Sequence, residues 1–239
     1  MKLLDLTLAT TEENLALDEA LLETAESSAA PEECLRLWES PRPAVVVGRA
    51  SRVEEEVCVP YCREAGIAIL RRCSGGAAVV IGPGCLMYAV VLNCDQRPAL
   101  RMIEQAHQFV LDRISCALAR CQLDVHFQGT SDLTVGDRKI SGNSLRCKRG
   151  SLLYHGTILY QFSPELIERC LKTPPRQPEY RRGRSHRAFT SNVSLTSEQI
   201  RAVLPADWPI EGPLVDWPTT LTARLAAERY ARDEWNRRL

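Results

Sequence analysis

The stretch RRCSGGAAVV, residues 71–80, places two arginines, a serine and two glycines beside an apolar run. Arginine guanidinium groups suit carboxylate and phosphate oxygens, and adjacent glycines let the backbone approach a ligand closely because no Cβ stands in the way. The combination is typical of a loop whose arginines and glycines surround an anion. Taken alone, the segment slightly favours a hairpin with a charged rim, since residues 67–70 and 77–81 both have the pattern of short buried strands.

A second stretch, SDLTVGDRKISGNS at residues 131–144, shifts this balance toward anion binding. Gly136 and Asp137 have the pattern of a two-residue hairpin turn, which would hold Lys139 rigidly on the next strand. A lysine ammonium is a compact point charge for a phosphate oxygen. YHGTIL, at residues 154–159, adds His155 on a further strand. Taken singly, Lys139 as a surface residue and His155 as a core histidine are the alternatives.

These candidate residues need a scaffold of short strands and a few helices. Strands and helices mix in the pattern without strict βαβ alternation, which predicts the α+β class. Apolar patterning predicts strands at 2–8, 34–39, 44–48, 67–70, 77–81, 86–92, 123–127, 132–135, 138–144 and 152–160. Helical periodicity and capping residues predict helices opened by Thr10, Ser163 and Pro218, and others over 54–65, 99–121 and 197–203, with an extended loop over 174–187.

Length and composition restrict the class of protein. A chain of 239 residues can bury one sizeable core but is short for two, so a single domain over residues 1–239 is expected. It is 45% hydrophobic and 25% charged with a formal net charge of zero, which excludes disordered and collagen-like chains. No apolar stretch has the length of a membrane span, and acidic residues follow the N-terminus too early for a signal peptide. We therefore expect a cytoplasmic protein that does not act in a membrane.

The ten cysteines form neither a metal-binding nor a disulfide pattern. No C-x-x-C occurs, which argues against a zinc ribbon. Most of the cysteines lie inside apolar segments, where a free thiol acts as a small hydrophobe. We expect reduced thiols in a reducing compartment.

Charge is unevenly distributed along the chain. Residues 1–60 hold 13 acidic and 5 basic residues, whereas residues 138–187 hold 12 basic and 3 acidic ones. The basic block favours an anionic ligand or an acidic partner surface. Nucleic acid is disfavoured because the block lacks interleaved aromatic residues, and a merely solvated basic face is the remaining alternative.

In this order, the motifs resemble those of the lipoate–protein ligase A family, within the superfamily of biotin and lipoate ligases and octanoyltransferases. The family's Arg-Arg-x-Ser-Gly-Gly-Gly-Ala-Val is similar to residues 71–79, its Arg-Lys-(Ile/Val)-Ser-Gly to 138–142 and its His-His-Gly-Thr to 154–157. The resemblance is strongest over 1–205. It implies an α+β fold of mixed, largely antiparallel sheets flanked by helices, similar to class II synthetases. It also implies a catalytic domain without the accessory C-terminal domain of bacterial-type relatives.

The resemblance implies a two-step reaction, in which ATP and Mg²⁺ activate lipoate or octanoate to an acyl-adenylate before transfer to a lysine of a lipoyl-domain protein. Lys139 would be the catalytic residue, binding the α-phosphate and the acyl carbonyl. The implied partners are lipoyl-domain acceptors, such as subunits of 2-oxoacid dehydrogenases or the glycine-cleavage H protein, with a separate accessory protein as a further candidate. The implied substrate- and cofactor-binding residues are Arg72, Ser74, Gly75, Gly76, Ala77, Ala78, Val79, Val80, Asp132, Ser141, Gly142, His155, Gly156 and Thr157.

Four residues depart from the family pattern and leave the choice between lipoate and octanoate open. Ala77 stands at a glycine position, Ser131 at an asparagine position and Tyr154 at a histidine position. Cys85 stands where many ligases carry asparagine.

The alternative function is an octanoyl- or lipoyltransferase that carries the acyl group as a cysteine thioester without ATP. Such an enzyme needs an activated thiol, and Cys85, Cys147 and Cys170 are the candidates. Cations beside Cys147 are expected to lower its pKa, whereas Cys85 is expected to pack against the acyl chain and Cys170 to face a helix–sheet interface. Lys139 argues against a third interpretation, a non-catalytic binding module. A biotin ligase is disfavoured because its glycine-rich signature does not occur.

Overall fold

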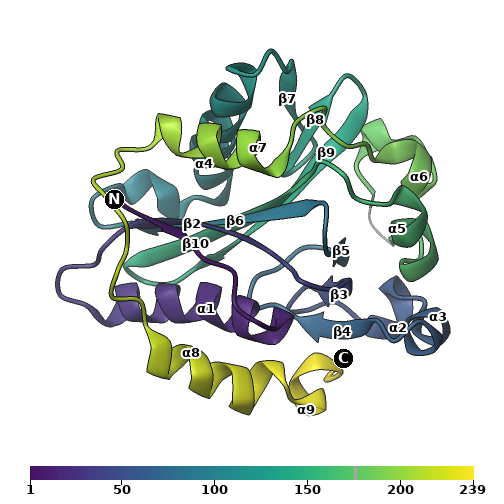
Figure 1. Ribbon diagram of the computed structural model, residues 1–239, viewed down its shortest axis with the longest axis horizontal. Coiled ribbons are helices and arrows are strands. Elements are labelled where there is room, and N and C mark those ends of the chain that lie inside the picture. The colour runs from purple at the N-terminus through teal and green to yellow at the C-terminus, as the bar shows by residue number, and fades with distance from the viewer. Residues whose placement is uncertain (175–176) are drawn as a thin grey trace.

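Helices cover both faces of a seven-stranded sheet in the computed structural model, which describes residues 1–174 and 177–239 (Figure 1). The strand order is β1-β2-β6-β10-β9-β8-β7. Only β1 and β2 run parallel within this described sheet; the other neighbours are antiparallel. The strands are β1 (Lys2–Asp5), β2 (Cys34–Glu39), β6 (Cys85–Asn93), β7 (Val125–Gln128), β8 (Asp132–Val135), β9 (Arg138–Cys147) and β10 (Ser151–Leu159).

A smaller sheet carries the first of the two motifs. Its order is β4-β3-β5, formed by β3 (Ala44–Val47), β4 (Ala68–Arg71) and β5 (Val79–Ile81). β3 lies between β4 and β5, parallel to the former and antiparallel to the latter. The predicted hairpin is therefore wrong, because residues 72–78 connect two strands that do not pair with each other. We call residues 72–78 the glycine loop.

The helices largely follow the predicted capping residues. Thr10 caps α1 in a capping box with Glu13, and Ser163 caps α5, as expected. The single helix predicted over 54–65 is instead two helices, because Pro60 in the first turn of the second cannot continue an earlier helix. The α-helices are α1 (Thr11–Ser27), α2 (Val53–Glu56), α3 (Val59–Glu64), α4 (Ile103–Ala119), α5 (Pro164–Cys170), α6 (His186–Phe189), α7 (Ser197–Val203), α8 (Thr219–Leu225) and α9 (Asp233–Asn236).

The remaining helical turns are short. The loop predicted over 174–187 is wrong in part, since it holds η2 and the start of α6; residues 175–176 lie outside the described residues. No helix among the described residues is both long and apolar enough to cross a membrane. The short helical turns are η1 (Pro98–Arg101), η2 (Glu179–Arg181), η3 (Leu204–Asp207) and a π-helical turn, η4 (Ala226–Tyr230).

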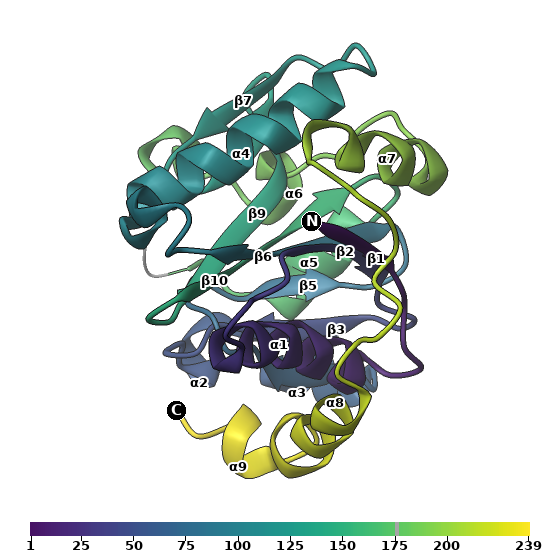
Figure 2. The same cartoon turned by 90° about the vertical axis from the view of Figure 1, so that its left-hand side faces the viewer.

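The layers of the fold follow from the alternation of side chains along β6. Tyr88 and Val90 pack into a core with α4, and Ala89 and Val91 pack on the opposite face with α1. Figure 2 shows α4 on one side of the sheet and α1 on the other, with α8 beyond α1. Because β6 is buried on both faces, its sequence is a continuous apolar run. The predicted α+β class is confirmed.

Candidate active site

The two neighbouring arginines at the end of β4 have different partners. Arg71 is completely buried, and its guanidinium donates to the carbonyl oxygens of Gly48, Ser51 and Asn236 at 2.8, 2.7 and 3.1 Å. The Trp235 indole N–H in turn donates to the Arg71 carbonyl at 2.7 Å. The expectation that both arginines surround an anion is wrong for Arg71, which ties β4 to the C-terminal segment.

Arg72 organises the glycine loop from within. Its guanidinium donates to the carbonyl oxygens of Ala77 at 2.9 Å and Gly75 at 3.1 Å, and to Val46 of β3 at 3.0 Å. Burial lowers the pKa of Arg72 to about 10, which leaves it a cation at neutral pH. Gly76 has a φ of +83°, in the left-handed region that favours glycine. The charge of Arg72 therefore holds the loop in a turn that requires a glycine.

Three side chains from other elements anchor the glycine loop. Ser144 on β9 donates its hydroxyl to the Gly75 carbonyl at 2.9 Å, and Ser74 Oγ lies 2.6 Å from His155 Nε2 on β10. The Ala78 N–H donates to Glu56 Oε2 at 2.5 Å. The loop of the small sheet thus meets β9 and β10 of the large sheet, which carry Lys139 and His155.

Lys139 is positioned as its hairpin predicts. Gly136, with a φ of +59°, begins the turn between β8 and β9, and Lys139 follows on β9. Its Nζ lies 2.6 Å from Asp132 Oδ1, and Asp132 Oδ2 accepts a 2.7 Å hydrogen bond from the Tyr180 hydroxyl. Burial and the Asp132 charge raise the pKa of Tyr180, which keeps the phenol protonated. One carboxylate thus positions a partly exposed ammonium group.

The strand positions around Lys139 are tightly packed. A Cβ added to Gly142 would lie 2.9 Å from Lys139 Nζ and 3.0 Å from its Cε. The Gly142 N–H donates to Thr157 Oγ1 at 3.2 Å. Gly156 lies so close to Asn143 that a Cβ there would come within 1.7 Å of Asn143 Oδ1. Gly156 therefore leaves no room for a side chain, whereas a methyl group at Gly142 would displace the end of the Lys139 side chain.

Asn143 is a site residue that the sequence did not single out. Its amide donates to the Ser131 carbonyl at 2.7 Å and to Ser141 Oγ at 3.0 Å, while its Oδ1 accepts from the Tyr88 hydroxyl at 2.5 Å. The sequence did offer one signal for Asn143, because this residue directly follows Ser141 and Gly142 of the second motif. Tyr180, in contrast, lay in a segment where nothing marked it.

The remaining loop residues lead into β5. Ala77 is exposed, Ala78 and Val79 are half-buried, and Val80 is buried in the core beside Ile81. Val80 is therefore a packing residue in this structure, and the role predicted for its backbone stays a prediction.

The candidate cysteines lack the features of an activated thiol. Cys85 and Cys170 are buried among apolar residues; burial raises the pKa of both, that of Cys170 to about 12. Burial also raises the pKa of Cys147, so the expected lowering by neighbouring cations is wrong. Loss of hydration outweighs the field of nearby cations, because a half-buried thiolate loses water while surface charges are screened.

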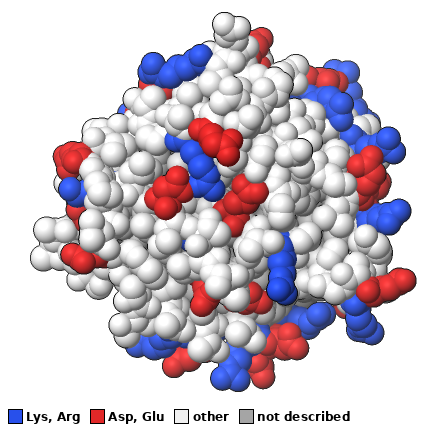
Figure 3. Space-filling view, in the orientation of Figure 1, with Lys and Arg blue, Asp and Glu red and all other residues white. Residues whose placement is uncertain are grey.

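Four basic residues of the block over 138–187, Lys139 among them, form ion pairs with acidic side chains in the described part of the chain. Lys148 pairs with Glu23, Arg184 with Asp137 and Arg187 with Glu165. Figure 3 shows basic and acidic side chains interspersed on the face it presents. The charge asymmetry of the sequence therefore does not become a uniformly basic surface on that face.

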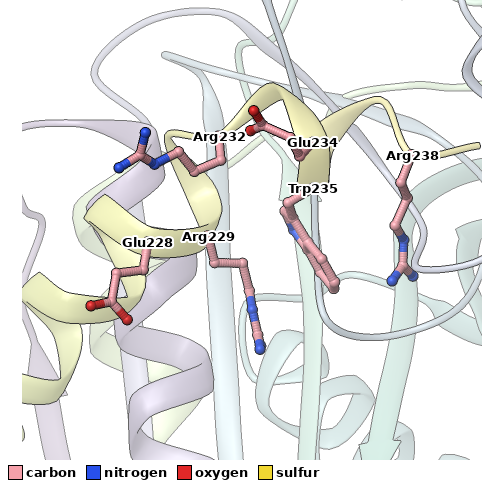
Figure 4. A pocket seen from close by; sticks show the side chains of 6 residues that line it. All are labelled: Glu228, Arg229, Arg232, Glu234, Trp235 and Arg238. Atoms are coloured by element: carbon pink, nitrogen blue, oxygen red, sulfur yellow. The ribbon is translucent and has the colours of Figure 1, made fainter.

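A surface hollow of about 590 Å³ lies on the C-terminal segment, and none of the predicted site residues lines it (Figure 4). Two of its arginines have partners. Arg229 pairs with Glu19 and stacks on Trp235. The guanidinium carbon of Arg238 lies 4.3 Å from the centre of the same Trp235 ring. Of these two arginines, Arg229 is thus neutralised by an acidic partner, whereas Arg238 is held by an aromatic ring. Its lining consists of Glu228, Arg229, Arg232, Glu234, Trp235 and Arg238.

Comparisons with known proteins concern the family and the fold of the chain. The family model of the lipoyl protein ligase A/B catalytic domain matches residues 10–206. Lipoate-protein ligase A subunit 1 of Thermoplasma acidophilum is 26% identical over 240 residues, 93% of this chain and 90% of that protein. Octanoyltransferase LipM of Geobacillus kaustophilus is 25% identical over 260 residues, 93% and 92% of the two chains. A crystal structure of lipoate-protein ligase A bound with ATP matches with a TM-score of 0.83 at 23% identity, over 99% of this chain and 98% of that one, which confirms the expected fold.

Proposed function

The chain belongs to the lipoyl protein ligase A/B catalytic-domain family, and we propose that it uses ATP to activate lipoate or octanoate and then acylates a lysine of a lipoyl-domain protein. One contrast carries this proposal. Lys139 presents a positioned ammonium group, whereas Cys85, Cys147 and Cys170 all have raised pKa values. The site is thus suited to chemistry by charge neutralisation rather than by a thiolate.

In the first step, an oxygen of the acyl carboxylate attacks the α-phosphorus of ATP and pyrophosphate leaves. Negative charge grows on the phosphate oxygens, and the Lys139 ammonium would exchange its contact with Asp132 for one with that phosphate. The fixed geometry of the glycine loop would hold the adenylate beside it. Arg72 supports this step indirectly, because its N–H groups bind loop carbonyls.

In the second step, the amine of the acceptor lysine attacks the acyl carbonyl. A carbon–nitrogen bond forms, the bond from carbon to the adenylate oxygen breaks, and AMP leaves while the amine loses a proton. Lys139 would stabilise the charge on both the carbonyl oxygen and the departing phosphate. The acceptor is therefore proposed to reach the Lys139 side of the glycine loop with its lysine deprotonated.

Mg²⁺ enters the proposal as the ion that accompanies ATP. It usually binds through substrate phosphates, waters and one or two carboxylates. Asp132, in contact with Lys139, is a carboxylate that could join such a set. We further propose lipoyl-domain proteins as acceptors and a separate accessory protein as a candidate partner in adenylation.

The test is a comparison of acyl donors. Purified protein is supplied with lipoate, ATP and Mg²⁺, or with octanoyl-loaded carrier protein alone, and the mass of a lipoyl-domain acceptor is followed. The proposal expects pyrophosphate release and acylation only with ATP, and retention of both in Cys85→Ser, Cys147→Ser and Cys170→Ser. An ATP-independent acyl-enzyme that hydroxylamine cleaves, missing from one of these variants, identifies an octanoyltransferase instead.

A further inference from the structure

A line of buried polar side chains runs behind the glycine loop. It starts at Arg36 on β2, whose Nη1 lies 2.5 Å from Asp18 Oδ1 on α1. Asp18 Oδ2 lies 3.6 Å from His155 Nδ1, and His155 Nε2 lies 2.6 Å from Ser74 Oγ. The line ends at Arg72, whose Nε donates to Ser74 Oγ at 3.1 Å. All five residues are buried.

The direction of each hydrogen bond follows from the donors available. Ser74 Oγ accepts from Arg72, so its own hydrogen needs an acceptor, and His155 Nε2 is the acceptor found within the described ranges 1–174 and 177–239. The ring proton of a neutral His155 then sits on Nδ1, facing Asp18 Oδ2. The distance of 3.6 Å between these two atoms is too long for a hydrogen bond, but it places the N–H beside a carboxylate.

Packing alone does not account for these polar groups. Leu17, Leu21 and Leu22 surround Asp18 in sequence and fill an apolar core. Asp18 Oδ2 and His155 Nδ1 are both buried without a hydrogen-bond partner among the described residues. Burying such atoms is unfavourable, so their placement calls for a role beyond filling space. The line ends on the arginine that binds the Gly75 and Ala77 carbonyls.

We propose that Asp18 and His155 are positioning residues for the glycine loop. Asp18 orients the His155 ring, His155 fixes the Ser74 hydroxyl, and Ser74 directs Arg72 onto the loop carbonyls. The consequence for catalysis rests on the proposed function, in which this loop holds the acyl-adenylate. The Ser–His–Asp order resembles a nucleophilic triad, but Ser74 is 1% exposed and accepts from Arg72, which suits anchoring rather than attack.

Two substitutions of one residue separate positioning from packing. In His155→Gln the amide oxygen replaces Nε2 and keeps an acceptor for Ser74; in His155→Asn the shorter amide replaces Nδ1 and leaves Ser74 without one. Thr11→Val is the matched control, because it removes a buried hydroxyl from α1 that bonds Ser40 and not the loop. Should His155→Asn not fold, Ser74→Ala tests the same contact.

The first measurement is hydrogen–deuterium exchange of peptides covering residues 72–79 in the ligand-free protein. We expect faster exchange in His155→Asn and near-wild-type exchange in His155→Gln and Thr11→Val. This readout needs no activity, so it stands even if the wild type fails to bind a lipoyl-adenylate analogue and the proposed function is wrong. Equal exchange in the two His155 variants contradicts the positioning role.

The second measurement is calorimetric binding of a non-hydrolysable lipoyl-adenylate analogue, together with steady-state kinetics. Losing one buried hydrogen bond predicts binding about tenfold weaker in His155→Asn. We expect KM for ATP to rise likewise while kcat at saturation changes less than about twofold, because Lys139 is untouched. An unchanged Kd, or an acyl-serine on wild-type Ser74, overturns the inference.

Discussion

Gly142→Ala is expected to slow the reaction without destabilising the fold. The added Cβ would lie 2.9 Å from Lys139 Nζ and 3.0 Å from Cε. Unbonded heavy atoms prefer a separation of about 3.5 Å or more, so the ammonium must move by roughly 0.6 Å. Since it is the far end of a flexible side chain, it can move without disturbing the backbone.

The size of the loss follows from the demands of positioning. A misplacement of about 1 Å can lower a rate about 100-fold, so a shift of roughly half that size predicts kcat lower by about 10- to 100-fold. The backbone at Gly142 is not in the left-handed region. Replacing such a glycine by alanine stabilises a fold by about 0.4–1 kcal/mol through the unfolded chain, so activity and stability should not fall together.

The assay is ATP-dependent acylation of a lipoyl domain followed by mass, with urea unfolding of the same preparation. Gly150→Ala is the matched control, because its Cβ would meet nothing closer than Asp95 Oδ2 at 3.4 Å. It should keep both activity and stability. If Gly142→Ala retains near-wild-type kcat, or loses activity only in proportion to unfolding, the geometric argument about Lys139 is wrong.

Three further outcomes are expected. Lys139→Ala should abolish acylation with an unchanged circular dichroism spectrum, and Lys139→Arg should not restore it, because a planar fork replaces a point charge; substantial activity in either variant contradicts the assignment. Gly76→Ala should cost about 1–3 kcal/mol in urea unfolding, since its φ of +83° strains any side chain; an unchanged midpoint and slope contradict this. Iodoacetamide at pH 8 should label exposed Cys116 but not Cys170, whose pKa of about 12 leaves little thiolate until the pH approaches that value; early labelling of Cys170 by peptide mass contradicts its burial.

Local chemistry explains which features the sequence could predict. The turn at Gly136 and the position of Lys139 depend on a few neighbouring residues, so the hairpin was predictable. The apolar run of β6 likewise indicated a buried strand, because both of its faces are covered by helices. The Pro60 boundary was misjudged because helical periodicity continued across it.

Pairings between distant segments could not be predicted. Arg71 is held by Gly48, Ser51 and Asn236, the last of them 165 residues away in the chain. No period or spacing near RRCSGG indicates such partners, so both arginines appeared equally suited to an anion. The position of β3 between β4 and β5 likewise depends on how separate strands pair, which the local sequence does not indicate.

The role of Asp18 could be predicted from the sequence only in part. Helical periodicity puts it on the apolar face of α1, one turn from Asn14 and from Leu22, where an unpaired carboxylate is unfavourable. That mismatch indicates a buried partner of opposite charge or a hydrogen-bond donor, although periodicity does not say which. The fold supplies Arg36 on β2 and His155 on β10. A charged residue on an apolar helical face was therefore the sequence signal for the line of buried polar side chains. Only the packing of α1 on the sheet showed that this line ends at the glycine loop.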